Sequence, residues 1–238
     1  MSTLAEPRFA PARLVSSESV GGGLSLLAID PGRAVVRTYD SPGQYVEVRA
    51  DGQTGYFVLA NEPGEPMWHL VMKSGGGASD VLLRMSPGDA LEVTQAIGEG
   101  FPMDGVRGRA LVVALGGSGL AAGRPLLRHR IREGDAARTS VFVALRKREE
   151  SALEDDLDAW ASAGVAVIVC LSQESLVEER GRFVHGRIPD VLQAFAASHP
   201  RAVASAMVFS VGTPAMVDSL RAVAPSVGIR PEDVLTNH

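Results

Sequence analysis

The sequence is poor in several residue types and patterns, and each shortage excludes a class of protein. One of the 238 residues is a cysteine, so the chain carries neither a disulfide framework nor a cysteine-ligated iron–sulfur cluster. The 23 basic residues form no stripe and are outnumbered by 28 acidic ones, so nucleic acid is not an expected partner. No apolar run approaches the roughly 20 residues of a membrane span, and residues 1–13 lack the apolar core of a signal peptide. We therefore expect a soluble, cytoplasmic protein.

Glycine, by contrast, is plentiful, and its most informative cluster follows a short apolar run. Residues 110–115 are all apolar, which is typical of a strand buried on both faces of a parallel sheet. The glycines of residues 116–119 then let the backbone turn sharply, and the helix expected next directs its amides at an anion. This order of strand, turn and helix favours a nucleotide cofactor, although similar turns also occur without a ligand.

Two other interpretations of this turn fail on spacing. A nucleophile elbow needs a second glycine where Leu120 stands, so Ser118 is a poor candidate for a nucleophile. A Walker-type phosphate loop needs lysine followed by serine or threonine, but Ala121 and Ala122 follow the last glycine. A nucleotide bound through its pyrophosphate remains the favoured interpretation.

The two parts of the chain have different periodicities. Up to about Met103, short alternating segments are separated by turns rich in proline and glycine, which predicts an antiparallel Greek-key barrel with one helix over residues 79–85. From Arg107 onward, apolar strands alternate with helical patterns, which predicts a doubly wound parallel α/β domain. We expect domains over residues 1–105 and 106–238. The predicted strands of the second domain are 110–115, 140–145, 165–171 and 206–211, and its predicted helices are 123–132, 151–163, 188–198 and 214–224.

Six short motifs occur in an order that resembles one known family. They are residues 42–46, 76–79, 87–101, 116–121, 211–217 and 235–238. From about Leu14 to its end, the chain resembles the ferredoxin–NADP reductase-like flavin oxidoreductase superfamily, in which a FAD-binding barrel precedes an NAD(P)-binding domain. The resemblance implies a flavin-dependent NAD(P)H oxidoreductase. Such an enzyme passes hydride from the nicotinamide to FAD and electrons on to an external acceptor, such as a protein.

The resemblance also assigns residues to each cofactor. FAD would contact Phe57, Val58, Leu59 and Asn61 on a barrel strand and Gly76, Gly77, Ala78 and Ser79 before a helix. NAD(P)H would contact Gly116, Gly117, Ser118, Gly119, Leu120, Arg146, Gly212, Thr213, Pro214 and Met216. His238 would lie against the flavin. No residue is assigned a catalytic role, because the cofactors carry the hydride, and no metal is expected. Independently of the family, Ser79 is a candidate N-cap for a helix whose amides would face a phosphate.

The expected flavin strand departs from the family's pattern of arginine, any residue, tyrosine, then serine or threonine. Gly55 replaces the arginine that neutralises the flavin pyrophosphate, and Phe57 replaces the tyrosine. Val58 and Val211 replace polar groups near the hydride path. Arg49, Lys73 or Arg84 could supply the missing cation.

Three questions stay open from the sequence. Residues 171–174 carry no cation, which favours NADH over NADPH, whereas Arg146, Arg180 and Arg182 could reverse that preference. A nucleotide-binding module of the same fold with weakened or lost flavin binding is an alternative function. An electron-transfer subunit of a larger complex is another.

Overall fold

An antiparallel sheet forms the first part of the chain, which we call the barrel lobe. The structure is a computed structural model that describes residues 8–174 and 181–237. Buried and solvated residues alternate along strands such as β1, so one face of the sheet packs on a core. The strands are β1 (Ala10–Ser19), β2 (Ser25–Asp30), β3 (Tyr45–Ala50), β4 (Gln53–Val58), β5 (Trp68–Met72) and β6 (Ala90–Val93), and the helices are α1 (Arg33–Val36) and α2 (Gly77–Arg84).

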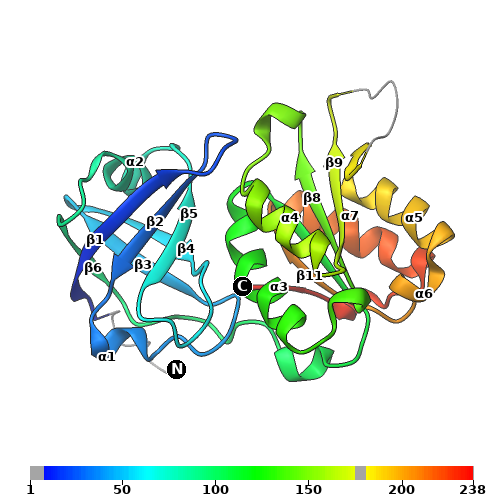
Figure 1. Cartoon of the computed structure of the whole chain (residues 1–238), viewed down its shortest axis with the longest axis horizontal. Coiled ribbons are helices and arrows are strands. Elements are labelled where there is room, and N and C mark those ends of the chain that lie inside the picture. Colours follow the sequence, from blue (N-terminus) through cyan, green and yellow to red (C-terminus); the bar gives the residue numbers. More distant parts are fainter. Residues whose placement is uncertain (1–7, 175–180, 238) are drawn as a thin grey trace.

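The sheet of the barrel lobe has the order β4-β3-β6-β1-β2-β5 and curves around its core (Figure 1). Among the described residues, the two outer strands are joined only by an isolated bridge between Leu59 and Leu70. The sheet is therefore barrel-like but not closed, which refines the predicted barrel. α2 packs against β4 and β3.

A parallel sheet forms the second part, the α/β lobe, with the order β10-β9-β8-β7-β11-β12. All neighbouring strands in it run parallel, which confirms the predicted doubly wound fold. Its strands are β7 (Leu111–Gly116), β8 (Thr139–Leu145), β9 (Ala166–Leu171), β10 (Phe183–His185), β11 (Met207–Val211) and β12 (Val234–Thr236). Its helices are α3 (Leu120–Arg132), α4 (Glu154–Ser162), α5 (Ile188–Ser198), α6 (Pro200–Val203) and α7 (Pro214–Val223).

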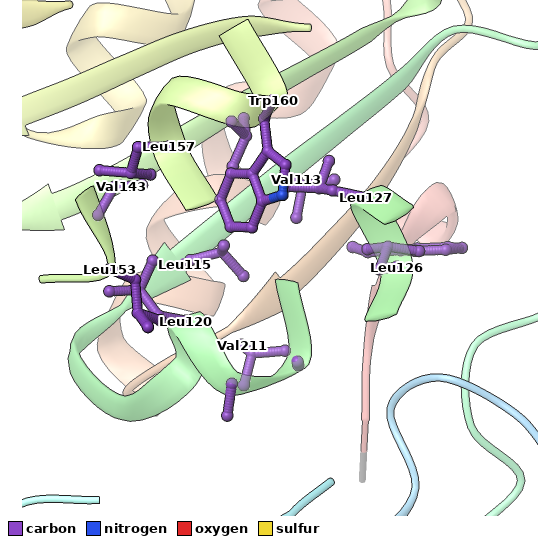
Figure 2. Packing of buried hydrophobic residues seen from close by; sticks show 14 of the residues in the cluster. Val113, Leu115, Leu120, Leu126, Leu127, Val143, Leu153, Leu157, Trp160 and Val211 are labelled. Atoms are coloured by element: carbon purple, nitrogen blue, oxygen red, sulfur yellow. The ribbon is translucent and has the colours of Figure 1, made fainter. Parts of the chain in front are cut away.

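The central strand β7 is buried on both faces, as its apolar run predicts. Val113 and Leu115 face a core that contains Trp160 of α4 and Leu126 of α3 (Figure 2). Val112 and Ala114 face the opposite core, which holds residues of α5 and α7. Helices thus cover both sides of the sheet and leave its strand ends open to a ligand.

Three helix starts differ from their predicted positions. α3 begins at Leu120, because a 3-10 turn over Gly117–Gly119 leads directly into it. α4 begins at Glu154, because Leu153 before it has a left-handed φ of 55°. α2 begins at Gly77, two residues before the predicted start. The edge strands β10 and β12 are three residues long each and carry no periodic signal in the sequence.

The lobes share an apolar core and a backbone contact. Leu24 and Val71 of the barrel lobe belong to the same cluster as Leu115 of β7. The β1–β2 hairpin reaches the loop after β8, where Gly21 pairs with Ala152. The Leu153 amide also donates to the Val20 carbonyl at 2.8 Å. The hairpin therefore holds the two lobes together beside the carboxyl ends of the parallel strands (Figure 1). Among the described residues, no helix combines the length and apolar character needed to cross a membrane.

Candidate functional site

A cavity of about 840 Å³ opens at the carboxyl ends of β7 and β11. The order of the sheet reverses there, because β8 lies on one side of β7 and β11 on the other. Loops that leave such neighbours in opposite directions form the usual ligand crevice of a doubly wound sheet. The cavity brings together most of the residues assigned to the dinucleotide. They are Gly116, Gly117, Ser118, Gly119, Leu120, Arg146, Gly212, Thr213 and Met216, whereas Pro214 does not line it.

The turn after β7 packs directly on the backbone of β11. A Cβ atom at Gly119 would lie 2.4 Å from the Val211 carbonyl oxygen, so only glycine fits there. No side chain caps the turn or the start of α3, and neither has an acidic residue in its first turn. The exposed amides and the positive end of a 13-residue helix therefore remain available to an anion.

The loop after β11 forms the facing wall. Thr213 caps α7, because its Oγ1 accepts a hydrogen bond from the Met216 amide at 3.3 Å. Pro214 occupies the first turn of that helix, where its missing N–H costs nothing. A Cβ atom at Gly212 would lie 2.4 Å from Met216 Cε, and one at Gly116 would lie 3.3 Å from its sulfur. The Met216 side chain thus spans both glycines.

An ion pair lies on a third side of the cavity. Arg146 Nε donates to Glu150 Oε1 at 2.7 Å, and the Arg146 amide donates to Glu150 Oε2 at 2.9 Å. The hydrogen bond from the Arg146 side chain lowers the pKa of the Glu150 carboxyl. The charge of Arg146 is therefore already balanced by its neighbour.

The barrel lobe closes the cavity with residues that the sequence did not assign to the dinucleotide. Gly22, Leu24 and Lys73 line it. Gly22 has a left-handed φ of 56°, and a Cβ atom there would lie 2.1 Å from the Glu150 carbonyl oxygen. Three successive glycines mark this hairpin as a turn in the sequence, but no local pattern shows that it meets the second lobe.

Cys170 lies at the carboxyl end of β9 and lines the cavity, although 1% of its surface is exposed. Burial raises the pKa of its thiol to about 12. The thiol is therefore neutral at physiological pH, as expected for a buried apolar cysteine rather than a nucleophile.

The described residues assigned to the flavin do not line this cavity. Phe57 is partly buried against the core of the barrel lobe, and Val58 against the core that both lobes share. Leu59 and Asn61 are fully buried. Asn61 Oδ1 accepts from the His69 amide at 2.8 Å, and its Nδ2 donates to the Glu62 carbonyl at 3.0 Å. Neither residue exposes side-chain or backbone surface that a flavin could contact.

The loop before α2 corrects the prediction for Ser79. The N-cap position belongs to Gly76, and Ser79 Oγ donates to the Gly76 carbonyl at 2.9 Å. The helix begins earlier because glycines at positions 76 and 77 adopt left-handed φ values of 92° and 59°. No side chain caps α2, and Asp80 instead binds the loop before it, since its Oδ1 accepts from the Gly75 amide at 3.1 Å.

Of the three expected substitutes for the missing flavin cation, one is ion-paired and another lines the cavity of the α/β lobe. Arg49 Nε donates to Glu92 at 2.7 Å, and its guanidinium lies 4.0 Å from the centre of the Phe9 ring. Lys73 lines the cavity of the α/β lobe. Arg84 lies one turn after Asp80 and helps to lower the pKa of that carboxyl. Arg180 and His238 lie outside the described residues.

The two cofactors fit these residues unequally. The cavity, its glycines and its uncapped helix start suit a nicotinamide dinucleotide. Phe57 and Val58 offer apolar surface to a flavin ring. The loop before α2, however, has its own carboxylate where a flavin phosphate is expected.

The chain has relatives of known sequence. No protein-family profile matches it. The fruit protein pKIWI502 of Actinidia deliciosa is 24% identical over 218 residues, which cover 84% of this chain and 67% of that protein. The reductase component DmpP of phenol 2-monooxygenase from a Pseudomonas strain is 32% identical over 114 residues. That match covers 45% of this chain, which thus spans only 32% of the length of DmpP.

Solved structures match almost the whole chain. The Amycolatopsis cytochrome P450 reductase GcoB superposes with a TM-score of 0.80 at 19% identity, over 99% of this chain and 73% of that one. A ferredoxin NADP+ reductase from Neisseria gonorrhoeae, with bound FAD and NADP, superposes with a TM-score of 0.75 at 16% identity, over 98% of this chain and 100% of that one. The shared architecture confirms the resemblance that the motifs predict: the chain has the fold of the ferredoxin–NADP reductase-like flavin oxidoreductase superfamily.

Proposed function

We propose that the chain is an NAD(P)H-dependent flavin oxidoreductase. The observation that carries the proposal is the meeting of two glycine loops, after β7 and β11, on one cavity of about 840 Å³ at the switch point of the sheet. A ferredoxin NADP+ reductase with bound FAD and NADP shares this fold, and a relative in sequence is named as a reductase component. In this proposal residues 1–105 hold the flavin and residues 106–238 hold the dinucleotide.

The residues of the chain bind and orient the dinucleotide. The amides of Gly117–Gly119 receive its pyrophosphate, and the contact of Gly119 with β11 keeps that turn in place. Val211 and Met216 provide an apolar wall that excludes water from the ring. When bound, the nicotinamide supplies a hydride and the flavin accepts it, so the protein contributes positioning rather than a reacting side chain.

NADH is the favoured dinucleotide in this proposal. A 2′-phosphate needs an available cation near the ribose. Arg146 is paired with Glu150, and Arg182 forms ion pairs with Asp158 and Glu154. Ser172 lines the cavity without a charge, whereas Arg187, which also lines it, is a cation that could reverse this preference.

We infer that the electron acceptor lies outside this chain, because one cysteine cannot ligate an iron–sulfur cluster. The matched names "reductase component" and "subunit gamma" of a sulfhydrogenase favour a protein as the acceptor. Co-purification with a second chain tests the alternative that this is one subunit of a larger complex.

The central experiment separates binding from turnover. NADH and NADPH are titrated into the pure protein and followed by dinucleotide fluorescence. Flavin is then added without oxygen, and the visible flavin absorbance is followed after NADH addition. We expect NADH to bind more tightly than NADPH and to bleach the flavin. Absence of dinucleotide binding would contradict the proposal, and binding without bleaching would identify a nucleotide-binding module.

A further inference from the structure

The loop before α2 holds an anion of the protein itself. Asp80 Oδ1 accepts hydrogen bonds from the Gly75 amide, at 3.1 Å, and from the Ser74 hydroxyl, at 2.8 Å. These groups, together with the Gly76 amide, are the donors of the loop just before α2, and a phosphate in this loop would compete with Asp80 for them. Hydrogen bonds from all three lower the pKa of Asp80, so its carboxylate is charged at neutral pH. A flavin phosphate that entered this loop would meet a negative charge and donors that are already engaged.

The opposite wall, on β4, is filled by an aromatic ring. A Cβ atom at Gly55 would lie 3.1 Å from Ala78 Cβ and 3.1 Å from Cε2 of Phe57. The Phe57 ring therefore lies over Gly55 and against the first turn of α2. It occupies the volume that a longer side chain at position 55 would need in order to reach a phosphate.

The charge that a phosphate requires is also missing between these walls. Arg49 is paired with Glu92, and Lys73 lines the other cavity. Arg84 lies in the last turn of α2, at the opposite end of the helix from this loop. On this face of β4 the region offers the apolar surface of Phe57, which is partly exposed and suits stacking of a planar ring.

We propose that the chain recognises a flavin through its isoalloxazine ring alone, an inference that rests on the proposed function. Because of the Asp80 carboxylate, the phosphates of FMN and FAD add nothing to the affinity. Asp80 is therefore the specificity-determining residue of the site. Riboflavin, FMN and FAD are equivalent ligands, and each exchanges with free flavin in solution.

Fluorescence titration of the full chain with the three flavins tests this. A single charge-assisted phosphate contact stabilises a complex by about 1.5–3 kcal/mol, or roughly 10–150-fold in Kd. We therefore expect the three wild-type Kd values to agree within about fivefold, which is below one such contact.

Asp80→Asn keeps the shape of the loop and removes its charge. We expect this variant to bind FMN and FAD at least about fivefold more tightly and to bind riboflavin as the wild type does. Asp89→Asn is the matched control, because Asp89 likewise accepts a loop amide, that of Ser86 at 2.8 Å, but lies outside the loop before α2. It should change none of the three Kd values.

Three results would overturn the proposal. They are a wild-type preference for FMN or FAD over riboflavin beyond about fivefold, flavin that stays bound through dialysis, and an Asp80→Asn variant without the expected gain. The comparison of the three wild-type Kd values tests the proposal even if the Asp80→Asn variant does not fold. NADH binding is measured separately and tests the proposed function. A difference among the three flavin Kd values is therefore distinguishable from a loss of dinucleotide binding.

Discussion

Two glycine-rich turns lead into helices in this chain, and they differ in what their amides face. The turn over Gly117–Gly119 precedes α3, has no acidic residue in its first turn or in that of α3, and lines a cavity of about 840 Å³. The loop over residues 74–76 precedes α2 and is occupied by Asp80, the fourth residue of that helix. Glycine provides the backbone geometry in both places. The nearest acidic side chain decides whether the amides remain available to a ligand.

The largest expected effect comes from breaking the open turn. Gly119→Val places a side chain where the Val211 carbonyl already lies 2.4 Å from a Cβ atom. The turn must move, so we expect the Kd for NADH to rise at least about 100-fold, with riboflavin binding unchanged. Titration by dinucleotide fluorescence measures this. Gly105→Ala is the control, because a Cβ atom there meets nothing within 4 Å. Loss of both ligands together would argue against separate sites.

A carboxylate placed in the open turn should make it resemble the loop before α2. Ser118 is exposed and lines the cavity, so Ser118→Asp introduces a charge beside the expected pyrophosphate. We expect NADH to bind about tenfold more weakly, because like charges in a concave site repel. Ser118→Asn has the same shape without the charge and should stay within about twofold of the wild type. Equal effects of the two variants would show that shape, not charge, matters there.

Lys73 connects the two regions, since it follows β5 just before the loop of α2 and yet lines the dinucleotide cavity. Lys73→Ala should weaken NADH binding about fivefold in low salt and less in high salt, because the contact is between solvated charges. Lys147→Ala, an exposed lysine 3.8 Å from Glu149, is the control. An equal loss of riboflavin affinity would place Lys73 at the flavin instead.

The smallest effect concerns the acid stability of the occupied loop. The pKa of Asp80 lies below its ordinary value of 3.8, so its ionised form stabilises the native state above that pH. The contribution disappears as the pH falls through the lowered pKa. We expect Tm to fall less steeply below pH 3.8 in Asp80→Asn than in the wild type. Equal slopes of Tm against pH below 3.8 in the wild type and in Asp80→Asn would contradict this.

Much of the fold and half of the site follow from local patterns in the sequence. The apolar runs of β7, β8 and β11 are visible because parallel strands bury both faces. The turn after β7 and the loop after β11 meet because the carboxyl ends of neighbouring parallel strands lie at one edge of the sheet. Gly22 was missed, and Lys73 was expected at the flavin rather than at this cavity, because their positions depend on how the two lobes pack, which no local pattern encodes.

The flavin side shows why a correct motif does not by itself identify a site. Residues 76–79 match the expected motif, but the one-turn contact from Asp80 back to Gly75 depends on α2 starting at Gly77. A helix start two residues later, as predicted, would turn that carboxylate away from the loop. Helix boundaries are the least certain part of a sequence-based prediction, and here the function of the loop depends on one.

The bridge between Gly21 and Ala152 has a consequence for how the chain folds. It joins segments far apart along the chain, so the entropy of closing that long loop is lost only when both sheets exist. Leu24 beside it belongs to a core that is completed by β7 and β8. A fragment of residues 1–105 would expose this apolar surface to water. We therefore expect the two lobes to unfold in one cooperative transition, as a single foldon rather than as two independent ones.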